Sequence, residues 1–179
     1  KGNRQIPAGS IGQYTDKIIA LTAASKTFNL ADCQNAFILL ADEKLREEFD
    51  DFAEKIHVMQ GSGFGYIAVQ NAYEGGLDWL NGVLKIIEEN YVYARHFIER
   101  ELPEAVVSEL QGTYLMWIDL KPYLQDKDVV QTLQEKCHLA IDYGDWFGGE
   151  DWKYYIRVNL ATKTENIAQA MENLKRGLE

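Results

Sequence analysis

Two basic residues in this sequence stand in settings where their side chains could do chemistry. The first is Lys26, which follows the β-branched run 17–22 and lies in a turn of small polar residues, Thr22-Ala-Ala-Ser-Lys-Thr-Phe-Asn29. Partial burial of a lysine favours its neutral amine, a nucleophile that forms Schiff bases with carbonyl compounds. Most lysines are solvated surface residues, so that interpretation stays open beside the catalytic one.

The second residue is Arg157, in the run Tyr154-Tyr-Ile-Arg-Val-Asn-Leu160. Alternation along a strand would place Tyr155, Arg157 and Asn159 on one face, opposite an apolar face. An arginine on a largely buried strand usually pairs with a carboxylate, often through two hydrogen bonds. That carboxylate could belong to a substrate or to an acidic residue of this protein, and the sequence leaves both open.

Two glycine-containing segments could line a binding site. Gly61-Ser-Gly-Phe-Gly65 precedes a predicted helix, whose first N–H groups could bind an anion. It has neither the G-x-G-x-x-G spacing nor a Walker lysine, so a flexible connector is the alternative. Tyr143-Gly-Asp-Trp-Phe-Gly-Gly149 could form the lip of a pocket or a surface hydrophobic cluster.

Hydrophobic periodicity predicts the strands and helices that would position these residues. Strands are predicted at 17–22, 36–40, 106–110, 114–120, 139–141 and 154–160, the first two of them buried. Helices are predicted around 45–56, 66–73, 79–102, 129–133 and 167–178. Thr162-x-x-Glu165 has the form of a capping box before the last helix.

This order of elements predicts an α/β or α+β fold. The long helix that ends before Pro103 is expected to link two lobes, residues 1–75 and 76–179.

Composition excludes several classes of protein. The chain has 179 residues, 46% of them hydrophobic, and a formal net charge of −10. An acidic chain lacks the basic stripe that nucleic acids or anionic membranes require, and no apolar run is long enough to span a membrane. Cys33 and Cys137 form no C-x-x-C pair, and the three histidines show no ligand spacing, so we predict no metal site.

Five segments, taken in order, carry a resemblance to a known family. They are Ser25-Lys-Thr-Phe-Asn29, Ala72-Tyr-Glu-Gly-Gly76, Gly112-Thr-Tyr-Leu-Met-Trp-Ile-Asp119, Asp142-Tyr-Gly-Asp-Trp-Phe-Gly148 and Ile156-Arg-Val-Asn-Leu160. Together they resemble the MalY/PatB-type cystathionine β-lyases, a branch of the fold-type I pyridoxal-phosphate (PLP) enzymes in the class I/II aminotransferase superfamily. The resemblance covers the later part of the family's sequence. It implies an α/β chain that is a carboxy-terminal fragment, with the end of the large-domain sheet in 1–75 and a linking helix and α+β small domain in 76–179.

The resemblance also assigns roles to individual residues. Lys26 matches the lysine that forms the internal aldimine with pyridoxal 5'-phosphate, and Arg157 matches the arginine that binds the substrate α-carboxylate. Ser25 and Thr22 lie where hydroxyls near the cofactor phosphate are expected. The segment 61–65 resembles one that faces the cofactor of a neighbouring subunit.

Three functions are carried forward from the sequence. The resemblance favours a PLP-dependent C–S β-lyase of the cystathionine type, acting on small amino acids in a cytoplasmic homodimer without nucleic-acid or membrane partners. An aminotransferase on the same scaffold is the first alternative. A non-catalytic domain or proteolytic remnant is the second. We expect the chain by itself to be inactive and to bind the cofactor weakly or not at all, because the residues that would stack on the ring and pair with its nitrogen are not in it.

Overall fold

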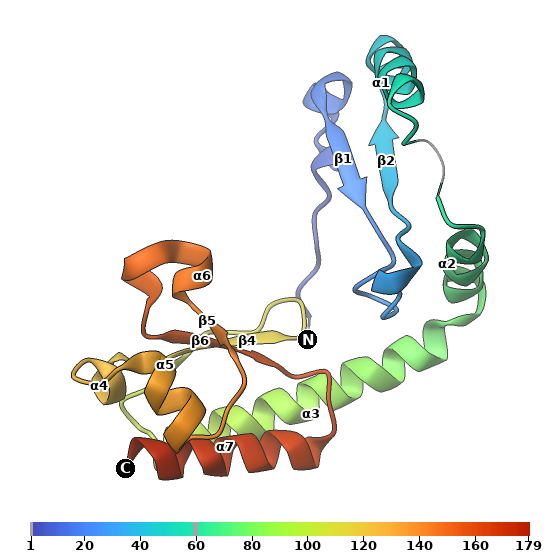
Figure 1. Ribbon diagram of the computed structural model, residues 1–179. Helices are drawn as coiled ribbons and strands as arrows, with labels where there is room; N and C mark the ends of the chain where they lie inside the picture. Colours follow the sequence, from blue (N-terminus) through green and yellow to red (C-terminus); the bar gives the residue numbers. More distant parts are fainter. Residues whose placement is uncertain (1, 59–60) are drawn as a thin grey trace. The chain divides into compact units, whose positions relative to one another are not determined.

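The computed structural model describes residues 2–58 and 61–179 (Figure 1). Within these ranges the chain divides into two compact units, Gly2–Asn81 and Gly82–Glu179, and the division falls inside the long helix α3, Leu77–Glu101. The assignment of lobes 1–75 and 76–179 to a cofactor domain and a small domain stays a prediction. No helix in the described ranges has the length and apolar character that a membrane span needs.

The Gly2–Asn81 unit is built around a two-stranded antiparallel sheet. Strand β1, Ile19–Thr22, pairs with β2, Phe37–Leu40, so that Leu21 lies opposite Ile38 and Ala20 opposite Leu39 (Figure 1). The other elements of this unit are short 3-10 turns at Ala8–Ser10, Gly12–Lys17 and Ala31–Cys33 and the helices α1, Glu43–Lys55, and α2, Gly63–Gly75.

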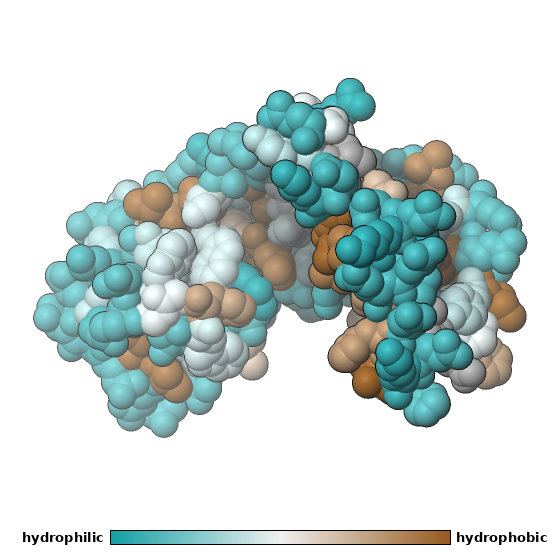
Figure 2. All heavy atoms as spheres, turned by 90° about the horizontal axis from the view of Figure 1, so that it is seen from above, coloured by the Kyte–Doolittle hydropathy of each residue, from teal (hydrophilic) through white to brown (hydrophobic). Residues whose placement is uncertain are grey.

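Both faces of this sheet are exposed, which corrects the prediction that its strands are buried. Leu21 is 74% exposed and its cross-strand partner Ile38 is 38% exposed, while Leu39 on the opposite face is 59% exposed. Figure 2 shows brown hydrophobic residues at the surface among teal hydrophilic ones. The β-branched pattern therefore identified the strands correctly, but the described residues supply no layer that covers them.

The Gly82–Glu179 unit contains a four-stranded antiparallel sheet in the order β3-β4-β6-β5. Figure 1 labels β4, β5 and β6 of this sheet. Its strands are β3, Val106–Val107; β4, Leu115–Asp119; β5, Asp142–Tyr143; and β6, Tyr155–Asn159. This unit also contains the rest of α3. Its other helices are α4 (Lys121–Leu124), α5 (Val129–Gln131), which continues into a π-helical turn at Thr132–Lys136, α6 (Asp145–Gly148), which is followed by a 3-10 turn at Gly149–Trp152, and α7 (Thr164–Leu178).

This unit has a hydrophobic core between one face of the sheet and helices α3 and α7. Met116 and Ile118 of β4 and Ile156 of β6 are fully buried, and the amphipathic stripes of the two helices pack into the same cluster. The two helices lie along the same side of the sheet (Figure 1). The strict alternation of buried and partly exposed residues along β4 and β6 leaves the opposite face of the sheet available for polar side chains.

Two local predictions are wrong. The apolar residues 139–141 form no strand; Leu139 and Ile141 pack against the core from a loop, and pairing with β6 begins at Asp142. The capping box is absent because α7 begins one residue later than expected, with Lys163 as its N-cap. Thr162 instead accepts a hydrogen bond from Asn166 on Oγ1 and one from the buried Asn90 on its carbonyl oxygen.

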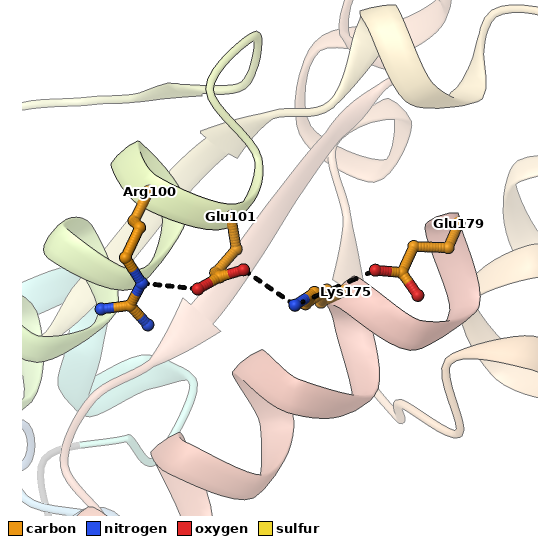
Figure 3. Close-up of polar contacts among 4 residues, drawn as sticks. All are labelled: Arg100, Glu101, Lys175 and Glu179. Atoms are coloured by element: carbon orange, nitrogen blue, oxygen red, sulfur yellow. Dashed lines mark hydrogen bonds and ion pairs between the residues drawn. The ribbon is translucent and has the colours of Figure 1, made fainter.

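Charged side chains join the carboxy-terminal ends of α3 and α7 (Figure 3). Glu101 accepts a hydrogen bond from Arg100 Nε at 2.5 Å and one from Lys175 Nζ at 2.8 Å, and Lys175 also lies 3.9 Å from Glu179. The hydrogen bond from Lys175, and then the one from Arg100, lower the pKa of Glu101, and the hydrogen bond that Lys175 donates to Glu101 raises the pKa of Lys175. The network therefore links the two core helices at the surface.

Candidate functional site

Arg157 lies in the middle of a row of side chains that crosses three strands of the larger sheet. Its cross-strand partners are Trp117 on β4 and Asp142 on β5, and residues directly opposite one another share a face. Asp142 Oδ2 accepts hydrogen bonds from Arg157 Nε at 3.0 Å and from Nη2 at 2.6 Å. The polar face predicted for this strand is confirmed. The carboxylate of Asp142 accepts hydrogen bonds from two of the three nitrogen atoms of the guanidinium.

Aromatic rings surround the same guanidinium. The Cζ atom of Arg157 lies 4.2 Å from the centroid of the Phe147 ring and 6.0 Å from that of Trp117, both within cation–π range. Phe147 and Trp117 contact each other edge to face at 5.4 Å, and Trp152 packs beside them. The segment 143–149 thus places an aromatic ring directly over the arginine.

Two glycines allow the segment 143–149 to pack closely against Trp152 and the sheet. A Cβ atom on Gly148 would overlap the Trp152 ring, and one on Gly144 would overlap the carbonyl oxygen of Trp152 and lie 2.7 Å from the Cβ of Tyr155. Burial, and then the neighbouring Asp119, raise the pKa of Tyr155. Tyr155 lies on the same face of β6 as Arg157, and its phenol stays neutral at physiological pH.

Lys26 lies on the turn that follows β1, in the other unit. The turn is closed by hydrogen bonds from Phe28 N to the Ala24 oxygen and from Leu30 N to the Ser25 oxygen, both 2.9 Å, and Ala24 is fully buried. The Lys26 side chain itself is exposed. The described residues hold its backbone in place but do not bury its amine.

An aromatic cluster fastens this turn to α2 and to the start of α3. Phe28 contacts Tyr73 at 5.6 Å and stacks on Trp79 at 6.2 Å between ring centroids. A Cβ atom on Gly76 would lie 2.8 Å from the Phe28 ring, so glycine is needed for this approach. Two of the five segments that carried the family resemblance are therefore brought into contact by Phe28.

The remaining candidate residues lie near the same turn or on α2. Ser25 is half-buried and Thr22, the last residue of β1, is exposed. Ser62 is the N-cap of α2 and accepts a hydrogen bond from Gly65 N, while a Cβ on Gly65 would lie 2.5 Å from the Cys33 oxygen. Gly65 is thus required by close backbone packing.

Sequence reasoning missed Asp142 as the partner of Arg157. The two residues are 15 positions apart, and only the register of β5 against β6 brings them together. Among residues 2–58 and 61–179, no group of three or more histidine, cysteine, aspartate or glutamate side chains is arranged to hold a metal ion.

Comparisons with known proteins agree with the resemblance. The chain is 26% identical to cystathionine beta-lyase PatB of Bacillus subtilis (strain 168) over 181 residues, which span 99% of this chain and 46% of PatB. A PLP-bound protein from Clostridium difficile 630 that is named as an aminotransferase matches all of this chain and 46% of its own, with a TM-score of 0.94 at 30% identity. The PLP-bound C–S lyase of Staphylococcus hominis, complexed with L-cycloserine, matches 99% of this chain and 46% of its own, with a TM-score of 0.88 at 27% identity.

No protein-family model matches the chain. The chain spans somewhat less than half the length of the relatives it matches. Its sequence is similar to cystathionine beta-lyase PatB and to Protein MalY of Escherichia coli (strain K12), and its α/β fold is that of the carboxy-terminal portion of PLP-dependent aminotransferase structures.

Proposed function

We propose that this chain supplies the cofactor lysine and the carboxylate-binding arginine of a PLP-dependent C–S β-lyase that acts on amino acids carrying sulfur on Cβ. The observation that carries the proposal is the guanidinium of Arg157, which is held on a sheet face with Nη1 not used by the described residues. A planar, permanently charged fork of this kind suits a substrate carboxylate. The names of PatB and of the Staphylococcus hominis lyase support the choice of reaction.

Lys26 would act through its Nζ atom. The exposed amine is accessible to an aldehyde, and the hydroxyls of Ser25 and Thr22 lie within four residues of it, so these residues fit a phosphorylated aldehyde cofactor. Bound pyridoxal phosphate would supply an electron sink for the charge that develops on the substrate Cα. When its Nζ is free, Lys26 would take the proton from that Cα.

Arg157 would fix the substrate by its carboxylate, which orients the Cα–H and Cβ–S bonds for the reaction. Positioning of this kind can supply several kcal/mol of barrier reduction. Loss of a thiol from Cβ, followed by addition of water, gives a thiol, pyruvate and ammonia. A homodimer is implied by the resemblance alone, and the oligomeric state stays a prediction.

Selective labelling tests the role of Lys26. The complete protein of which this chain is proposed to be part is incubated with pyridoxal phosphate, reduced with borohydride to fix the label, and mapped by mass spectrometry. Lys26 is expected to be labelled at lower concentrations than Lys44, whose side chain is 85% exposed in α1 and which serves as the matched control. Equal labelling of the two lysines would contradict the assignment and would favour a non-catalytic domain, the alternative that the exposed faces of β1 and β2 support.

An aminotransferase is the second candidate. Lys26 and Arg157 would serve transamination equally, and the Clostridium difficile relative carries that name. Product analysis with cystathionine, in the complete protein of which this chain is proposed to be part, separates the two reactions. Release of pyruvate and ammonia supports the lyase, whereas transfer of the amino group to an added 2-oxo acid supports the aminotransferase.

A further inference from the structure

The guanidinium of Arg157 is constrained in two independent directions. Asp142 contacts it through one oxygen only, Oδ2, which receives hydrogen bonds from Nε and Nη2. Phe147 covers one face of the group at 4.2 Å. The first contact fixes which edge of the planar group faces β5, and the second places an aromatic ring against the group, which limits how far the group can rotate.

These constraints leave the other edge of the guanidinium open. An arginine side chain has five N–H donors in a rigid fork. The bonds to Asp142 use the Nε edge, and within residues 2–58 and 61–179 no hydrogen bond involves Nη1 of Arg157. The side chain of Arg157 is 24% exposed, so the described residues do not bury it completely.

We propose that Asp142 is the positioning residue of the carboxylate site: it occupies the Nε edge of Arg157 so that an amino-acid carboxylate binds only through Nη1 and Nη2. This inference rests on the proposed function for the identity of the ligand. Asp142 does not touch the substrate; it decides the direction from which a carboxylate can approach. Phe147 prevents the guanidinium from tilting out of that orientation.

The orientation can be measured at the arginine itself. We suggest NMR of the full 179-residue chain with ¹⁵N-labelled arginine, with the Arg157 signals assigned by their loss in Arg157→Lys, and with acetate as the probe. In the natural sequence, acetate is expected to shift the Nη signals of Arg157 while the Nε signal stays nearly constant. In Asp142→Ala the Nε signal should respond to acetate as well, and rotation about the Cζ–Nε bond should speed up by about tenfold, because a charge-assisted hydrogen bond is lost.

Two further variants separate positioning from general effects. Asp142→Asn keeps an oxygen at the same place and should retain the response confined to Nη, whereas a purely electrostatic role would make it behave like the alanine variant. Asp151→Asn removes an exposed charge from the neighbouring 149–152 turn and should change nothing at Arg157.

The proposal is overturned if acetate shifts Nε and Nη equally in the natural sequence, if it shifts neither, or if Asp142→Ala leaves both the pattern and the rotation rate unchanged. Circular dichroism of each variant confirms that it is folded. The labelling of Lys26 reports on the proposed function separately. Failure of that labelling with the acetate pattern intact would remove the amino-acid assignment and leave the positioning role of Asp142 supported.

Discussion

The two units of this chain differ in how far they bury hydrophobic residues. Within residues 2–58 and 61–179, nineteen of the twenty-two buried hydrophobic residues belong to Gly82–Glu179 and three to Gly2–Asn81. Both units contain strands rich in isoleucine and leucine. In the larger sheet these residues alternate between a buried and a polar face, whereas on β1 and β2 apolar side chains are exposed on both faces.

The difference shows that a strand's sequence does not stabilise it without a covering layer. Strands with apolar residues on both faces are typical of sheets that are covered on both sides. An isolated two-stranded ribbon is marginally stable at best. Gly82–Glu179 closes its own core, while β1 and β2 present the Lys26 turn from a sheet that the described residues leave uncovered.

Amide hydrogen exchange should give the largest contrast between the units. The amides of β6 are expected to exchange on the order of a thousandfold more slowly than those of β1, because opening a core strand costs far more free energy than opening an exposed ribbon. The measurement is exchange followed by mass spectrometry or NMR on the same sample. Equal protection of Tyr155–Asn159 and Ile19–Thr22 would remove the contrast.

Matched truncations should separate the same two strand environments. Ile118→Ala, at a fully buried position of β4, is expected to lower the free energy of unfolding by about 2–5 kcal/mol. Leu21→Ala, at a residue that is 74% exposed on β1, should change it by no more than about 0.5 kcal/mol. Urea unfolding measures both; a large loss in Leu21→Ala would mean that β1 is covered in solution.

A pair of helical glycines tests how tightly the larger unit is packed. A Cβ atom on Gly177 in α7 would lie 2.6 Å from the Cys137 nitrogen, whereas nothing lies within 4 Å of one on Gly82 in α3. Gly177→Ala is therefore expected to destabilise the chain by about 1–3 kcal/mol. Gly82→Ala should instead stabilise it by up to about 1 kcal/mol, because alanine favours helix. Thermal unfolding of both variants checks the opposite signs.

The smallest expected effect concerns the ion pairs of the two units. The pKa of Glu101 is lowered in the folded chain, chiefly by the hydrogen bond from Lys175, so Glu101 adds stability above the ordinary pKa of a glutamate and loses it as the pH falls through the lowered value. Glu101→Gln should therefore melt at a lower temperature than the natural sequence at neutral pH, and the gap should close in acid.

Glu48→Gln is the control for that measurement. Glu48 pairs with Lys44 at 3.7 Å on the exposed surface of α1, where such pairs contribute little. It should show no gap at either pH. A gap for Glu101→Gln that persists in acid would contradict the role assigned to the network in Figure 3.

Much of the fold follows from local patterns. The periodicity of α1, α3 and α7 and the alternation along β4 and β6 were predictable, because an amphipathic helix or a half-buried strand repeats its apolar residues at the period of its own backbone. The short elements α4 and α6 were not predicted. One turn of helix has too few residues to show a period.

The same distinction between local pattern and tertiary contact applies to the candidate site. The sequence by itself determined that Lys26 follows a strand in a small polar turn and that Arg157 lies on the polar face of a strand, since each depends only on neighbouring residues. The tertiary structure alone decided that Asp142 pairs with Arg157, that Phe147 covers it and that Phe28 fastens the Lys26 turn to Tyr73 and Trp79. Those contacts join residues distant in sequence, and they exist only once strand register and helix packing have brought the segments together.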